Sequence, residues 1–233
     1  MERDNKKEIE TQIKDSELVR IKHLQIAKGA TRLFIKKGYF KTSMREISKA
    51  TGITIGNLYD YIQKKEDILY LVFDVFHSVW TNKLERRKVH EIEDPVEQLK
   101  TALQMMFEIV GTHRDMVLLM YTESKLLPKE FLKRILENES NLVSYFEAIL
   151  RGGVERAVFR VKDPFLMANV IVYLLSMEPL RGWNLRNRYR VEEVNEYLME
   201  SILEGMLRVP QSRIEKAPLL LKASREETDR RNQ

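Results

Sequence analysis

The stretch that decides the fold is residues 42–69, which reads TSMREISKATGITIGNLYDYIQKKEDIL. Ser43 followed three residues later by Glu46 predicts a capping box, which begins a short helix. Gly52 ends that helix, and Thr54 is a second N-cap candidate for another short helix that runs to Tyr61. Two helices of about two turns, joined by a short glycine-containing turn, form a helix-turn-helix arrangement.

A longer helix is predicted immediately upstream, over residues 17–37. Its apolar residues recur at three- and four-residue spacing and therefore lie on one face: Ile26, Ala27, Ala30, Leu33 and Phe34. Gly38 follows its basic last turn, as expected at a helix C-terminus. Because helices of two turns do not persist alone, this helix must supply the packing surface for the helix-turn-helix.

The positive charge of the chain lies in the same region. The 233 residues carry a net charge of +5, whereas residues 18–65 alone carry +9. A basic segment on a near-neutral body indicates a module that binds a polyanion. The alternative from charge alone is a solvated lysine-rich face.

Residues 42–69 closely resemble the DNA-binding domain of TetR-type (tetracycline-repressor-like) transcriptional regulators. The signature positions of that family are met here by Gly52, Ile53, Thr54, Gly56, Leu58, Tyr59, Tyr61, Lys65, Glu66 and Ile68. Ile55, Asp60 and Ile62 depart from the common pattern. Asp60 in particular argues against the transfer of a known operator sequence, because a carboxylate repels phosphate and alters base preference.

The helical pattern along the rest of the chain predicts an all-α protein of about nine helices, among them one that ends at Gly152-Gly153 and a strongly apolar one from Asp163 to about Arg181. The resemblance implies an N-terminal three-helix DNA-binding head with a helix-turn-helix, followed by a larger helical domain for ligand binding and dimerisation. We expect a charged N-terminal extension over residues 1–17, the head over 18–64, the larger domain over 65–208 and a mobile tail over 209–233. The extension has the pattern of a frayed or loosely helical segment.

The predicted DNA-binding residues lie at helix N-termini and on the second helix of the motif. They are Thr42, Ser43, Arg45, Thr54, Ile55, Gly56, Asn57, Tyr59, Asp60, Tyr61, Lys64 and Lys65. Residues at helix starts and the tyrosine hydroxyls suit phosphate oxygens. Arg45 matches the guanine edge, Asp60 can accept from a cytosine amino group, and Ile55 can contact a thymine methyl. Tyr59 could equally be a packed residue, and Asp60 could face solvent.

A hydrophobic small-molecule effector is expected in the larger domain. The candidate pocket residues are Phe76, Trp80, Phe107, Arg114, Met120, Tyr121, Tyr145, Phe146 and Tyr173. Large apolar residues at helical spacing can also be ordinary core. The C-terminal half is similar to regulators of fatty-acid metabolism that sense acyl-CoA, and a multidrug-type sensor of hydrophobic compounds is the alternative.

The resemblance implies a homodimer formed by the last helices. We expect the interface to comprise Phe165, Leu166, Val170, Leu174, Met177, Val194, Leu198, Ile202 and Met206. Two heads would then read half-sites about 34 Å apart, or a multiple of that distance, on a palindromic DNA operator. Together these features predict a ligand-responsive repressor.

Composition argues against the other classes of protein. With 43% hydrophobic residues the chain can form a core, and with no cysteine it has no disulfide, thiolate metal site or cysteine nucleophile. The four histidines are dispersed and no nucleotide-binding or hydrolase motif is present, so we expect no enzyme, no metal and no cofactor. The charged N-terminus and the absence of a long apolar run favour a soluble cytoplasmic protein without membrane contact. A non-DNA-binding helical adaptor is the remaining rival.

Overall fold

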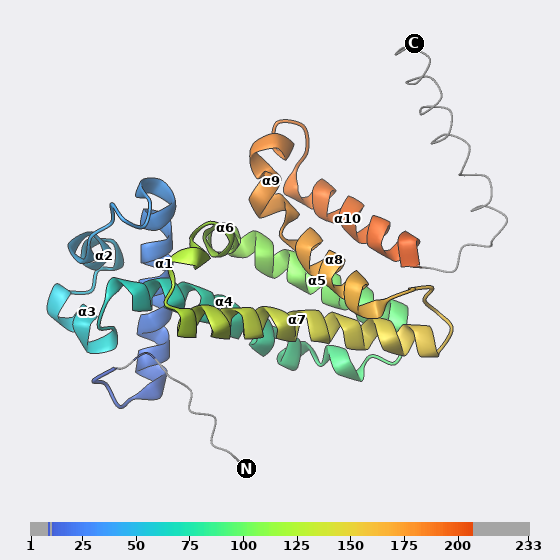
Figure 1. The fold of residues 1–233 in the computed structure, drawn as a ribbon, viewed down its shortest axis with the longest axis horizontal. Helices are drawn as coiled ribbons and strands as arrows, with labels where there is room; N and C mark the ends of the chain where they lie inside the picture. The colour runs from blue at the N-terminus through green and yellow to red at the C-terminus, as the bar shows by residue number, and fades with distance from the viewer. Residues whose placement is uncertain (1–8, 10, 207–233) are drawn as a thin grey trace, which may run out of the picture.

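A computed structural model describes residue 9 and residues 11–206 of the chain (Figure 1). Its regular elements in this part are ten α-helices and two short 3-10 helices. The α-helices are α1 (Ser16–Lys37), α2 (Met44–Thr51), α3 (Ile55–Tyr61), α4 (Lys65–Arg87), α5 (Pro95–Thr112), α6 (Arg114–Glu123), α7 (Lys129–Glu155), α8 (Pro164–Leu175), α9 (Met177–Leu185) and α10 (Val191–Met206). The 3-10 helices η1 (Val89–Glu91) and η2 (Ser124–Leu126) connect neighbouring α-helices. The all-α prediction is confirmed, while the predicted tail over 209–233 lies outside the described residues.

Helices α1, α2 and α3 form the head at the left of Figure 1. The capping box at the start of α2 is present: Ser43 Oγ accepts from the Glu46 amide, and the Glu46 carboxylate accepts from the Ser43 amide at 2.9 Å. Lys37 and Ser43 bind this carboxylate and lower the pKa of Glu46 to about 2. The predicted N-terminus of α2 is therefore stabilised by its own capping residues.

Gly52 and Gly29 of the head occupy positions that disfavour a side chain. Gly52 ends α2 in the left-handed region, with φ of 68°, which turns the chain toward α3. Gly29 of α1 faces α2 so closely that a Cβ there would lie 2.6 Å from the Thr51 methyl. The turn and the close α1–α2 contact thus depend on the absence of a side chain.

Helix α4 runs from the head into the larger domain, where it packs against α5, α6 and α7. α8 lies along α7, and α10 packs on α5. α6 contacts both the head helix α1 and α9. The head is therefore joined to the larger domain through two elements, the continuous helix α4 and the packed helix α6.

Two helix boundaries differ from the prediction. The segment that was expected to form one helix from Asp163 to Arg181 divides at Ser176 into α8 and α9. Pro179 explains the break, because its ring would clash with the carbonyl four residues earlier and it lacks an amide to donate. α7 continues to Glu155, through the glycine pair expected to end it, and Gly153 packs directly against the Phe159 ring.

The segment before α1 also differs from the frayed extension that was expected. Ile9 and Ile13 are partly buried against the core. Asp15 caps α1 by accepting from the amides of Glu17 and Leu18 at 3.1 and 3.0 Å.

No helix within the described residues has the length and apolar character to span a membrane.

Candidate nucleic-acid interface and ligand pocket

One face of the helix-turn-helix is open to solvent. The exposed residues from the predicted DNA-binding set are Ser43, Arg45, Thr54, Ile55, Gly56, Asn57, Tyr59 and Lys64. Thr54 Oγ accepts from the Asn57 amide, which fixes the start of α3. Leu58, between the exposed positions, is fully buried and anchors α3 to the core. The short recognition helix α3 thus presents one face to solvent and is held to the core of the head by the other.

Two residues of the predicted set are unavailable to DNA. Thr42 is 2% exposed, and its hydroxyl donates to the Gly38 carbonyl at 3.0 Å. Tyr61 is 7% exposed because its ring packs in the core of the head. The prediction that these side chains contact phosphate was wrong: both lie at helix ends, as the pattern indicated, but on the inner side.

Lys65 has a structural role that the sequence did not reveal. Its ammonium donates to the carbonyls of Tyr39 and Thr42 at 3.1 and 3.2 Å and lies 4.3 Å from the Tyr39 ring centroid. These contacts tie the first residue of α4 to the turn between α1 and α2. Lys65 therefore stabilises the head internally, and Lys64 beside it is the exposed cation.

We expect Lys65→Met to lower the free energy of unfolding by about 2 kcal/mol, because two charge-assisted hydrogen bonds and a cation–π contact are lost. Urea unfolding of the full chain measures this loss. Lys64→Met is the matched control: it should leave stability almost unchanged but reduce the salt dependence of DNA binding by about one unit. Equal stability of the two variants would contradict the internal role of Lys65.

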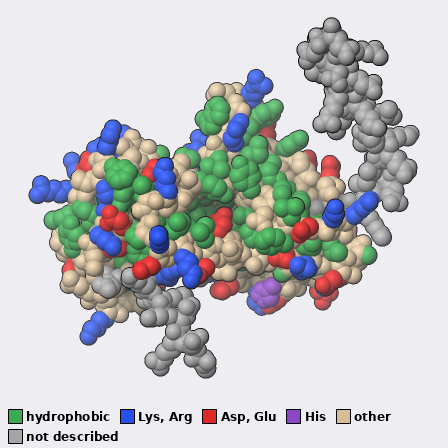
Figure 2. Space-filling view, in the orientation of Figure 1, with side chains coloured by type: hydrophobic (Ala, Val, Ile, Leu, Met, Phe, Trp, Pro, Cys, Tyr) green, Lys and Arg blue, Asp and Glu red, His purple; other side chains and the backbone are tan. Residues whose placement is uncertain are grey.

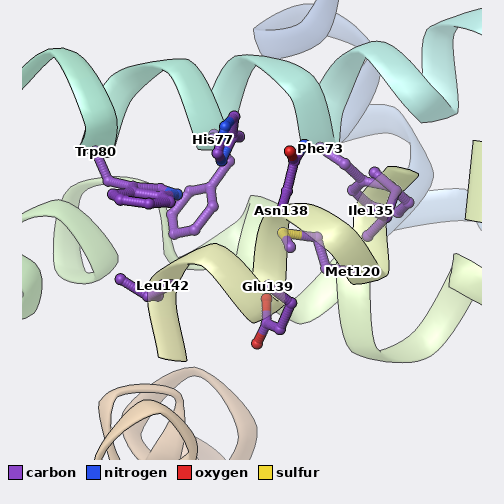
Figure 3. Close-up of a pocket in the computed structure, with 9 residues that line it drawn as sticks. Phe73, His77, Trp80, Met120, Ile135, Asn138, Glu139 and Leu142 are labelled. Atoms are coloured by element: carbon purple, nitrogen blue, oxygen red, sulfur yellow. The ribbon is translucent and has the colours of Figure 1, made fainter. Parts of the chain in front are cut away.

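A small cavity lies in the larger domain between α4, α6 and α7 (Figure 3). It is lined by Phe73, Phe76, His77, Trp80, Met120, Ile135, Asn138, Glu139 and Leu142. The ring centroids of His77 and Trp80 lie 4.9 Å apart in an edge-on arrangement on α4. A cavity volume of about 20 Å³ holds about one water molecule, so a larger ligand must displace side chains.

Only Phe76, Trp80 and Met120 of the predicted pocket residues line this cavity. Phe107 and Phe146 are buried core residues, while Tyr121 and Tyr173 are 42% and 63% exposed. Tyr145 is half-buried beside Phe146, and burial raises the pKa of Tyr145 to about 12. Helical periodicity identified apolar faces correctly, but it does not distinguish a residue that lines a cavity from one packed in the core.

Arg114, predicted to anchor a ligand, belongs to a different cluster. Its Nε lies 3.6 Å from Oε2 of Glu178, a carboxylate on α9 that is 4% exposed. Arg186 donates to the other carboxylate oxygen from Nε and Nη2, at 2.8 and 2.5 Å. This ionic cluster joins α6 to α9. Arg114 therefore lies in an ion-pair cluster and does not line the cavity, so its assignment to the ligand pocket was wrong.

The polar residues that line the cavity were not among the pocket residues predicted from the sequence. His77, Asn138 and Glu139 interrupt the apolar stripes of α4 and α7, and this interruption is the signal that could have identified them. Burial raises the pKa of the Glu139 carboxyl, because removal from water disfavours the charged form. The cavity therefore combines aromatic walls with one acidic group and no lysine or arginine.

A second apolar surface lies on α8. Phe165, Leu166, Val170 and Tyr173 are between 42% and 63% exposed and follow one side of the helix. We call these four residues the α8 face, and Figure 2 shows apolar side chains gathered over α8 and α9. Leu174 and Met177 lie half-buried nearby. Exposed apolar surface of this kind is typical of interaction sites, and the predicted dimer interface included Phe165, Leu166 and Val170.

The α10 part of the predicted interface was wrong. Val194, Leu198 and Ile202 are each at most 8% exposed in the single chain, because α10 packs against α5. The side chain of Met206 lies outside the described residues. The apolar stripe of α10 therefore completes the core of its own domain.

Family models match both parts of the chain. The model described as bacterial regulatory proteins of the tetR family matches residues 26–70, which hold the helix-turn-helix. The model described as a tetracyclin repressor-like C-terminal domain matches residues 93–179. The chain belongs to the TetR family of transcriptional regulators. As in the rest of this TetR family, its role is regulation and not catalysis, in agreement with the prediction.

Known proteins resemble the chain over most of its length. It is 25% identical over 203 residues to the HTH-type transcriptional regulator HbdR of Aromatoleum sp. (strain CIB), covering 87% of each chain. The TetR family regulator PfmR from Thermus thermophilus superposes with a TM-score of 0.68 and 28% identity, over 78% of this chain and 99% of that one. AibR, solved in complex with isovaleryl coenzyme A and operator DNA, shares the fold with a TM-score of 0.65 and 23% identity, over 76% and 96% of the chains.

Proposed function

We propose that this chain is a dimeric repressor that a fatty acyl-CoA releases from a palindromic operator. The observation that carries the proposal is the path of α4. Phe73, Phe76, His77 and Trp80 line the cavity from this helix, and Lys65 at its start is bound to the head. One rigid element therefore links ligand binding to the position of the DNA-reading surface.

The distance along α4 supports a mechanical coupling. Trp80 lies 15 residues beyond Lys65, about 22 Å along an α-helix. A ligand that enlarges the small cavity must displace α4, α6 or α7, and α6 also contacts the head helix α1. By linkage, the effector weakens DNA binding only as far as it prefers the displaced arrangement.

The α8 face supports the dimer. Pairing two copies through this face would bury its exposed apolar side chains and hold two heads at a fixed separation. Operators for such dimers have half-sites about 34 Å apart, or a multiple of this, with two-fold symmetry. A change in head separation then breaks both sets of contacts together.

The assignment of an acyl-CoA rests on the large apolar side chains among the cavity's lining residues and on the likeness to AibR, whose structure contains isovaleryl coenzyme A. A hydrophobic cation is the second candidate, and a specific observation favours it. Glu139 is the acidic group of the lining, which contains no lysine or arginine, and aromatic walls with a carboxylate suit an amphipathic amine.

One titration tests the proposal and separates the two effectors. The operator duplex is first selected from a random DNA library by the full chain. Fluorescence anisotropy of this duplex then measures its release by acyl-CoAs and by alkyltrimethylammonium ions of the same chain length. We expect acyl-CoA to release the wild-type chain, with the half-release concentration of Glu139→Gln within about twofold of wild type. Release by the ammonium ion, weakened about tenfold in Glu139→Gln and unchanged in the exposed control Glu137→Gln, would favour the second candidate. Failure of both ligands would contradict control by either class.

A further inference from the structure

The chain immediately before α1 contacts the recognition helix. The Gln12 amide and the Thr11 hydroxyl both donate to the Asp60 carbonyl, each at 2.9 Å. Thr11 Oγ also accepts from the Ile13 amide at 3.2 Å, which shapes the local turn. We call residues 11–13 the N-terminal brace; Figure 1 shows this segment curving past the lower end of α1 toward α3.

The contacted carbonyl lies in the last turn of the recognition helix α3. α3 has seven residues, and the last four carbonyls of a helix lack partners within it. Ile62 donates to Leu58, and His23 Nε2 lies 2.9 Å from the Tyr61 carbonyl. The brace supplies the partners of the Asp60 carbonyl, so α3 is secured at its end by residues distant in sequence.

The brace is itself fixed at both ends. Ile9 and Ile13 pack against the hydrophobic core, and Asp15 caps α1 two residues after the brace. Residues 11–13 are therefore held firmly enough to transmit position to α3. The family match to the DNA-binding domain begins only at residue 26, so the brace lies outside the matched region.

The residues adjoining the contact are candidate DNA contacts. Tyr59 is 44% exposed, and Asp60 itself is half-buried at the edge of the reading surface. A helix of two turns that pivots about its buried Leu58 would move these side chains relative to the base edges. If the end of α3 is already fixed, less conformational entropy of α3 is lost when it binds DNA. The contacts that gain most are those that α3 makes with base edges, because they require its exact position.

We propose that the N-terminal brace positions α3 for sequence-specific readout, so that Thr11 and Gln12 determine operator affinity without touching DNA. This inference rests on the proposed DNA-binding function. It assigns a role in recognition to a segment that precedes the helix-turn-helix by about thirty residues in the sequence.

The test removes both donors in the full chain. Thr11→Val/Gln12→Pro lacks the hydroxyl and the amide, whereas Thr11→Ser/Gln12→Ala retains both. We expect the first variant to bind the operator duplex recovered by the wild-type chain about five- to tenfold more weakly. Its affinity for mixed-sequence DNA and its salt dependence should be unchanged, and amide exchange of residues 58–62 should accelerate. The second variant should behave as wild type.

Two results would contradict the proposed role of the N-terminal brace. Equal operator affinity of the two double variants would show that the contacts do not position α3. An equal loss on operator and mixed-sequence DNA would show that they act on the head as a whole and not on readout. A wild-type chain that recovers no operator from a random library would instead contradict the proposed function, and this outcome is distinct from either result.

Discussion

Leu166→Asp is expected to convert the protein to a monomer and to weaken operator binding by about 100-fold or more. Leu166 is 61% exposed on the α8 face, so a carboxylate there remains solvated in the single chain. In a dimer through this face, the same carboxylate would be buried without a partner, which is strongly unfavourable. Loss of the second head removes the gain in avidity from two linked half-sites.

Leu136→Asp is the matched control for this change. Leu136 is 58% exposed on α7 and lies outside the α8 face, so the same substitution tests general effects of an added charge. Analytical ultracentrifugation gives the mass, and anisotropy gives the operator affinity. A Leu166→Asp chain that remains dimeric and binds normally would show that the subunits associate through another surface.

The second large effect is expected at the reading surface. Arg45 is exposed in the first turn of α2, where its guanidinium can bind a guanine edge through two hydrogen bonds. Such a contact contributes about 1–3 kcal/mol of discrimination, so Arg45→Ala should weaken operator binding by about 10- to 100-fold. It should also relax base preference at one position of each half-site.

Lys28→Ala controls for the loss of a positive charge. Lys28 is exposed on α1, outside the helix-turn-helix, and its removal changes the net charge by the same amount. Binding to operators with single base changes measures the preference of each variant. If Arg45→Ala weakens binding to every sequence equally, Arg45 contacts phosphate and does not read bases.

The helix-turn-helix could be predicted from sequence because its determinants are local. The Ser43–Glu46 capping box, the left-handed Gly52 and the Thr54 N-cap each act within a few residues. Lys65 shows the limit of this reasoning: its position at a helix start suited a phosphate contact, yet its partners are carbonyls more than twenty residues away.

The larger domain was predictable in its helices but less so in their neighbours. The apolar stripe of α10 has the same pattern whether it covers α5 or a second copy of the chain, and only the fold shows that it covers α5. The cavity likewise depends on how α4, α6 and α7 cross, which periodicity does not specify. Pro179 was a local signal for the α8–α9 break, but the strongly apolar residues before it favoured one continuous helix.

The central claim is that the head reads DNA under the control of the larger domain. Selection of duplexes from a randomised library by the full chain tests this claim most directly. Selection is carried out with and without a long-chain acyl-CoA. We predict enrichment of two inverted half-sites, centred a whole number of helical turns apart, and loss of this enrichment when the acyl-CoA is present. Recovery of no motif above the starting library, at low salt and without effector, would contradict the account.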